Sequence, residues 1–128
     1  MNTSKLTVYG IPNCDSVKKA RSWLYELGMT YEFHDFKKQG VPADLLPEWL
    51  ASAGWQTLVN RKGTTWRKLD EVTRLAVVDD ASAIALMLAN ASVIKRPVVM
   101  WGDGVISVGF DVEVFAARRS SSGALTKM

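Results

Sequence analysis

Residues 6–17 read LTVYGIPNCDSV, and this stretch decides how the chain folds. Residues 6–9 combine alternating polarity with strand-forming side chains, which predicts a short strand. A glycine and a proline interrupt it, and apolar residues then recur at three- and four-residue spacing over 17–27, which predicts a helix. The only cysteine, Cys14, is therefore expected where a strand passes into a helix.

Outward from this stretch, the pattern predicts a second strand, an insertion and a hairpin. Residues 30–36 alternate ring-bearing and polar side chains, so strand, helix and strand form a βαβ unit with parallel strands and a right-handed crossover. Between about 42 and 91 the apolar spacing is helical but interrupted, without a strand signal. Residues 97–101 and 105–109 flank a Gly-Asp-Gly turn, which predicts an antiparallel hairpin, and Asp111 is placed to cap a final helix.

These elements predict one α/β domain over residues 1–128. A chain of 128 residues with 48% hydrophobic residues is long enough for a single core. We expect a mixed four-stranded sheet in the order βαβ … ββα, with a helical insertion at about 42–91 between its halves. The residues from about 120 to 128 are expected to form a flexible tail.

Composition argues against several functional classes. Sixteen Lys and Arg against thirteen Asp and Glu give a formal charge of +3, which is too mild to indicate direct binding of nucleic acid. No apolar run is long enough to cross a bilayer, and the N-terminus lacks the apolar core of a signal peptide. A single cysteine argues against a secreted, disulfide-stapled fold. We therefore expect a cytoplasmic protein without membrane association.

The position of Cys14 favours a reactive thiol over a cysteine that only packs in the core. Unpaired N–H groups at a helix start carry partial positive charge, which favours the thiolate, the form that attacks disulfides and oxyanions. The alternative is a buried small hydrophobe, the usual state of a free cysteine, but the flanking residues in Pro-Asn-Cys-Asp are mostly polar. With no second cysteine, any partner thiol must come from outside the chain. One cysteine and one histidine cannot build a zinc site, so no metal is predicted.

Residues 95–97, Lys-Arg-Pro, precede the predicted third strand and allow two interpretations. Proline commonly marks the beginning of a strand, because it lacks a backbone donor. It can also be a cis-proline that faces the thiol and leaves backbone groups open to pair with an extended peptide ligand. Periodicity leaves both interpretations open.

Four motifs resemble those of the ArsC-like/Spx-like thioredoxin-fold family, in the same order along the chain. Residues 10–20 (GIPNCDSVKKA) resemble its active-site loop, and 63–69 (GTTWRKL), 94–97 (IKRP) and 108–110 (VGF) resemble its later motifs. The resemblance covers nearly the whole chain and is strongest to the YffB-like branch, described as glutathione-dependent thiol reductases. It implies a thioredoxin-like sheet with a helical insertion and a cis peptide bond before the proline of the third motif.

The same resemblance implies roles for individual residues. Cys14 matches the nucleophile, and Arg96 matches an arginine that binds the oxyanion in arsenate reductases. Arg61 lies near the place of a second such arginine. The remaining expected binding residues lie within the motifs at 10–20 and 94–97 and are Asn13, Lys18 and Pro97.

Two departures from the family pattern bear on function. The third arginine of the arsenate reductases is expected near residues 106–108, where this chain has Ile-Ser-Val, and this disfavours arsenate reduction. Spx-type regulators often carry a second cysteine three residues after the first, a position held here by Val17. An intramolecular redox switch is therefore not expected.

The resulting prediction is a glutathione-dependent thiol/disulfide oxidoreductase with glutathione as co-substrate and no metal. Its partner would be a small thiol, a mixed disulfide or an oxyanion. An arginine beside the thiol fits this chemistry, because a thiolate that attacks an anionic substrate approaches a like charge, which a guanidinium offsets. The alternatives are an Spx-like RNA polymerase-binding regulator, with the insertion as its contact surface, and a true arsenate reductase.

Overall fold

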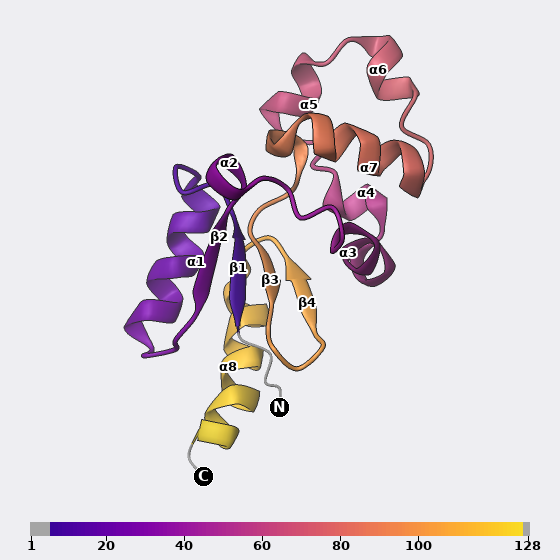
Figure 1. Ribbon diagram of the computed structural model, residues 1–128. Helices are drawn as coiled ribbons and strands as arrows, with labels where there is room; N and C mark the ends of the chain where they lie inside the picture. The colour runs from indigo at the N-terminus through magenta and orange to yellow at the C-terminus, as the bar shows by residue number, and fades with distance from the viewer. Residues whose placement is uncertain (1–5, 127–128) are drawn as a thin grey trace.

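The computed structural model describes residues 6–126 and contains one mixed sheet. Its strand order is β2-β1-β3-β4 (Figure 1). Strand β1 (Thr7–Gly10) pairs in parallel with β2 (Glu32–Asp35) and antiparallel with β3 (Val98–Met100), which pairs antiparallel with β4 (Ile106–Val108). The predicted mixed four-stranded sheet is confirmed.

Two long helices and an insertion complete the fold. Helix α1 (Asp15–Glu26) joins the two parallel strands, and α8 (Val112–Thr126) follows β4. The insertion between β2 and β3 is helical, as the sequence predicts, and consists of α2 (Phe36–Gln39), α3 (Leu46–Ala53), α4 (Trp55–Leu58), α5 (Thr64–Lys68), α6 (Glu71–Leu75), α7 (Asp80–Ala89) and the 3-10 helix η1 (Ala91–Val93).

The end of the chain differs from the prediction. The backbone remains helical to Thr126, where the sequence predicts a flexible tail from about residue 120. Residues 127–128 lie outside the described residues. Extending an established helix costs little per residue once its first turns are formed, which accounts for a helical backbone through this Ser- and Gly-containing stretch.

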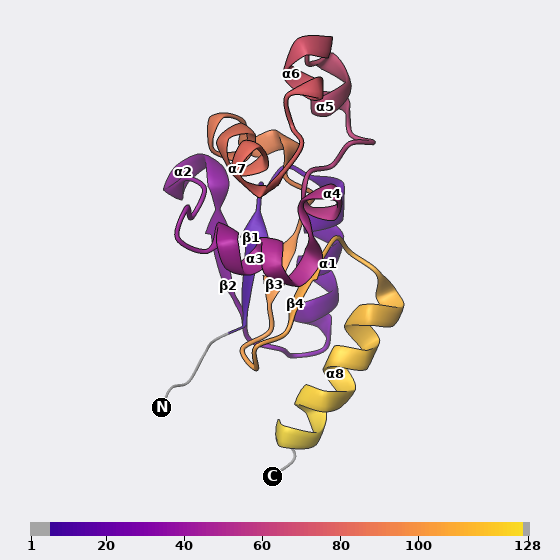
Figure 2. The same cartoon turned by 90° about the vertical axis from the view of Figure 1, so that its right-hand side faces the viewer.

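The sheet separates two hydrophobic clusters, because successive side chains of a strand point to opposite faces. Val8 belongs to the cluster beneath α1 and α8, together with Leu24 and Phe115. Tyr9 belongs to the cluster beneath the insertion, where its ring lies 4.9 Å from that of Trp49. The view in Figure 2 accordingly shows α3 in front of the sheet and α1 behind it.

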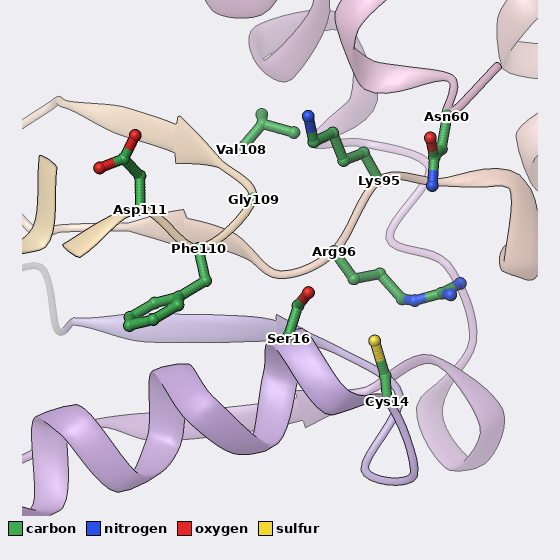
Figure 3. Close-up of a pocket in the computed structure, with 9 residues that line it drawn as sticks. All are labelled: Cys14, Ser16, Asn60, Lys95, Arg96, Val108, Gly109, Phe110 and Asp111. Atoms are coloured by element: carbon green, nitrogen blue, oxygen red, sulfur yellow. The ribbon is translucent and has the colours of Figure 1, made fainter. Parts of the chain in front are cut away.

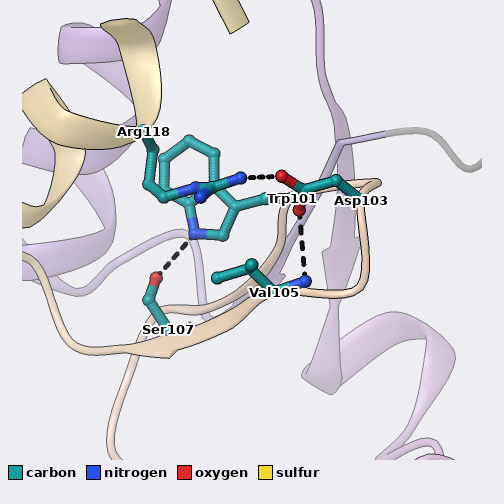
Figure 4. Close-up of polar contacts among 5 residues, drawn as sticks. All are labelled: Trp101, Asp103, Val105, Ser107 and Arg118. Carbon is teal, nitrogen blue, oxygen red and sulfur yellow. Dashed lines mark hydrogen bonds and ion pairs between the residues drawn. The ribbon is translucent and has the colours of Figure 1, made fainter. Parts of the chain in front are cut away.

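Polar contacts hold α8 against the hairpin (Figure 4). Arg118 pairs with Asp103 in the turn between β3 and β4 and lies over the ring of Trp101, 5.7 Å from the ring centroid. The Trp101 indole donates a hydrogen bond to the Ser107 hydroxyl at 2.9 Å. These contacts fix α8 and, with it, the segment that leads from β4 into the helix.

A close approach fixes the loop that carries Cys14. A Cβ added at Gly10, the last residue of β1, would lie 2.7 Å from a methyl carbon of Val17 in the first turn of α1. Val17 is fully buried and has no room to withdraw. Glycine at this position therefore lets α1 begin directly against the end of β1.

The insertion is tied to the beginning of β3 by a short antiparallel link. Val59 bridges Ile94, the Asn60 N–H donates to the Val93 carbonyl at 2.8 Å, and the Lys95 N–H donates to the Leu58 carbonyl at 2.8 Å. This link is the exception to an otherwise helical insertion, and it carries residues 60–62 toward the carboxyl end of β1.

We predict that Gly10→Ala lowers the free energy of unfolding by about 1–3 kcal/mol, because the added methyl overpacks the contact with Val17. Urea denaturation measures the change. Gly28→Ala is the matched control at the other end of α1: its cost is backbone strain at φ +71°, with open space around the added carbon. Only Gly10→Ala should also alter the alkylation rate of Cys14. Wild-type stability of Gly10→Ala would contradict the packing argument.

Candidate active site

Cys14 occupies the N-cap position of α1, with extended backbone angles of φ −120° and ψ 129°. This conformation turns the chain from β1 into the helix and leaves the sulfur near the N–H groups of Ser16 and Val17, which favour its anionic form. The thiol is half-buried and makes no disulfide. It therefore combines access to solvent with two backbone donors.

The surroundings of Cys14 lower its pKa. Partial burial is the largest single influence and raises the pKa of the thiol. The Val17 N–H, a hydrogen bond and the positive charge from Arg96, and the Ser16 N–H act the other way and together outweigh it. The net result is a Cys14 pKa below the usual cysteine value, which increases the thiolate fraction near neutral pH.

Arg96 is held in place beside the thiol. Its guanidinium donates a hydrogen bond to the Ser92 carbonyl at 2.9 Å, and its Nε is buried with no hydrogen-bond partner among the described residues. The remaining N–H groups of this half-buried guanidinium can still donate to a ligand, because Arg96 lines the cavity that contains Cys14. Arg96 is thus fixed at one end and still able to bind a negatively charged group.

Cys14 and Arg96 face the same cavity, of about 300 Å³ (Figure 3). Its wall combines the beginning of α1, the segment before β3, the insertion and the segment after β4. The lining residues are Cys14, Ser16, Asn60, Lys95, Arg96, Val108, Gly109, Phe110 and Asp111. A cavity of this size suits a small ligand.

Gly109 shapes the wall opposite α1. Its φ of +89° favours glycine, and a Cβ added there would lie 3.0 Å from the Cε of Lys95. Its N–H donates to the Pro97 carbonyl at 2.8 Å. This hydrogen bond joins the segment after β4 to the segment before β3 beside the cavity.

A family model described as the ArsC family matches residues 9–117. The chain belongs to the ArsC family. Among solved structures, it resembles the YFFB (PA3664) protein with a TM-score of 0.83 and 50% identity, over 88% of this chain and 97% of that one. It also resembles an arsenate reductase (ArsC) related protein from Brucella melitensis, with a TM-score of 0.70 and 48% identity, over 91% of this chain and 96% of that one.

A more distant relative carries a regulatory name. The global transcriptional regulator Spx of Streptococcus pyogenes is 28% identical over 98 residues, which make up 74% of this chain and 71% of the relative. Chains similar to this one are thus described in quite different functional terms.

The structure brings together some of the residues expected from the sequence. Cys14 and Arg96 line one cavity, and the Arg96–Pro97 peptide is cis, as the resemblance implies. Pro97 itself is buried outside the cavity lining. Asn13 and Lys18 are exposed and are not among the lining residues.

Arg61 lies apart from the thiol. It lines a neighbouring cavity, with its guanidinium 5.4 Å from the ring centroid of Trp55. Asn60, not expected from the sequence, lines the Cys14 cavity instead. Ser16 and Lys95 also line that cavity and were not expected there, although each lies within a motif that was recognised. Ser16 could have been found from its position, because it is the second residue of the helix that begins after Cys14.

Within residues 6–126, no three His, Cys, Asp or Glu side chains gather as candidate metal ligands. No helix in that range is long and apolar enough to span a membrane.

We predict that the alkylation rate of Cys14 by iodoacetamide rises with pH around a midpoint below that of an ordinary cysteine. The thiolate is the reacting form, so a lowered pKa moves the rise to lower pH. Arg96→Gln removes a positive charge and a donor and should move the midpoint upward. Lys19→Gln, an exposed cation on the same helix, is the control and should leave it unchanged. An unmoved midpoint in Arg96→Gln would contradict the role of Arg96.

Proposed function

We propose that this member of the ArsC family is a glutathione-dependent thiol–disulfide oxidoreductase with Cys14 as its single nucleophile. The observation that carries the proposal is the thiol of lowered pKa and the fixed Arg96 facing one cavity. A reactive thiolate beside a cation suits attack on an anionic disulfide. The reducing cytoplasm, where glutathione sets the thiol poise, is the compartment that suits this chemistry.

The proposed cycle has two exchanges. The Cys14 thiolate attacks the glutathione sulfur of a mixed disulfide, a Cys14–glutathione disulfide forms, and the other thiol leaves as a thiolate with the electron pair of the broken bond. A second glutathione thiolate then attacks the glutathione sulfur on Cys14. This step yields oxidised glutathione and restores the Cys14 thiolate, so the mixed disulfide is reduced at the expense of glutathione.

Individual residues would assist these exchanges in different ways. The N–H groups of Ser16 and Val17 stabilise the sulfur anion before attack and again when it departs in the second step. Arg96, which lines the cavity with the thiol, offsets the repulsion between the thiolate and the glutathione carboxylates. An external resolving thiol fits a chain with only one cysteine.

Intact-mass spectrometry tests this function. Wild type treated with oxidised glutathione should gain one glutathione, and reduced glutathione should remove it. Cys14→Ser should gain none. The proposal would be refuted if oxidised glutathione left Cys14 unmodified under conditions in which it modifies free cysteine. Full reductase activity in Cys14→Ser would also refute it.

The arsenate reductase alternative is less well supported. Strand β4 reads Ile-Ser-Val, so it offers no arginine where the third oxyanion-binding arginine would be expected. Arg61 does not line the Cys14 cavity. Only Arg96, of the arginines expected beside an oxyanion, lines the cavity with the thiol.

A polymerase-binding role has one specific observation in its favour. Helices α5 and α6 project away from the sheet in both views (Figures 1 and 2). On and just after α6, Val72, Leu75 and Val78 are 79%, 69% and 68% exposed. Neighbouring apolar side chains left in solvent are typical of a protein-binding surface.

Purified RNA polymerase tests this second candidate. If the exposed side chains form the contact, the protein should co-sediment with polymerase, and Val72→Lys with Leu75→Lys should abolish the association without unfolding the chain. No association of the wild type would remove this candidate and leave the reductase proposal untouched.

A further inference from the structure

A second cavity, of about 500 Å³, adjoins the one that contains Cys14. Asn60 and Lys95 line both cavities, so the two share a wall. The sharing follows from the link between residues 58–60 and 93–95, which places these side chains next to each other. A ligand bound at Cys14 would therefore have the second cavity directly beside it.

The second cavity is positively charged. Arg61, Lys62 and Lys95 line it, and none of its lining residues is acidic. Among the described residues, none of these three cations has an ion pair. Gathering like charges costs free energy unless an anion joins them, because each raises the local positive potential. The cavity is thus suited to a ligand with several negative charges.

Trp66 adds an aromatic surface to the same wall. It comes from α5, is half-buried and packs against the core beneath the insertion. Arg61 is itself held over the ring of Trp55. The cations can bind negative charges of a ligand, and the indole next to them can stack on a flat apolar group of the same ligand.

The second cavity also lies where a leaving thiol should go. In Figure 3, Asn60 and Lys95 lie on the side of the cavity away from Cys14. When a thiolate attacks one sulfur of a disulfide, a mixed disulfide forms and the other sulfur leaves. A leaving thiolate on the side opposite Cys14 would depart toward the Lys95 ammonium and the cations beyond it.

We propose that the second cavity is an anion-binding subsite for the leaving half of the mixed disulfide. The substrate class is then a mixed disulfide of glutathione with a small polyanionic thiol that carries phosphates or carboxylates. This inference rests on the proposed reductase function. The Cys14 thiolate takes the glutathione sulfur, and the polyanionic thiolate leaves with the electron pair of the broken bond into the positive subsite.

Turnover of a charge series tests the subsite. The substrates are glutathione mixed disulfides of coenzyme A, mercaptosuccinate, mercaptoethanol and cysteamine, which are phosphorylated, carboxylated, neutral and cationic respectively. Wild type should prefer the first two, and the preference should decline as salt screens the cations. The faster of the phosphorylated and carboxylated substrates shows whether the subsite binds phosphate or carboxylate groups better.

The double variant Arg61→Gln/Lys62→Gln measures the contribution of the subsite. The ratio of kcat/KM for anionic over neutral substrate should drop about threefold for each charge removed, or about tenfold in all. Lys19→Gln, on the exposed face of α1, is the control and should leave the ratio unchanged. An unchanged ratio in the double variant, or no charge preference in wild type, would overturn the inference while leaving the reductase function intact.

A binding measurement keeps the two proposals separable. Reduced coenzyme A and mercaptosuccinate are titrated into Cys14→Ser by calorimetry, with and without the Arg61→Gln/Lys62→Gln changes. At least one should bind, and more weakly to the variant that lacks the two cations. Binding without any turnover in wild type would support the subsite and refute the reductase, whereas binding of neither would refute the subsite.

Discussion

Arg96 can act on Cys14 because the antiparallel pairing of β1 with β3 sets the end of one strand beside the beginning of the other. Cys14 follows the end of β1, and Arg96 precedes β3. The pairing therefore brings a guanidinium to a thiol that is more than eighty positions away in the chain. The position of Arg96 is then fixed by the Ser92 carbonyl, and the lowered pKa of Cys14 depends in part on this contact.

The insertion completes the site from the other side. Its only described strand-like pairing, the bridge between Val59 and Ile94, places Asn60 and the cations that follow it next to the segment before β3. The same insertion holds its apolar side chains against the sheet around Tyr9 and Trp49. One segment thus supplies both half of the hydrophobic core and a positively charged wall near the thiol.

Much of this arrangement is visible in the sequence. The period of the apolar residues predicts the βαβ unit, the helical insertion and the hairpin, and the change from strand to helix singles out Cys14. The motifs around residues 94–97 and 108–110 point to segments that line the cavity. These features are local, so each can be recognised from a few neighbouring residues.

The remaining features depend on contacts between distant segments. No local pattern indicates that Asn60 faces the thiol cavity while Arg61 turns to Trp55, because the bridge to Ile94 decides both. The buried, unpartnered Nε of Arg96 likewise follows from packing, not from residue type. The helical backbone at the end of the chain likewise follows from extension of a helix already formed, which the local residue types do not indicate.

The pKa of the Cys14 thiol is the most direct measure of this account. It can be followed by the ultraviolet absorbance of the thiolate during a pH titration of wild type, with the same titration of Cys14→Ser subtracted. We expect a single transition with a midpoint below that of an ordinary cysteine. A midpoint at or above the ordinary value would show that burial outweighs Arg96 and the helix N–H groups, and would contradict a role for Cys14 as a nucleophile primed by its surroundings.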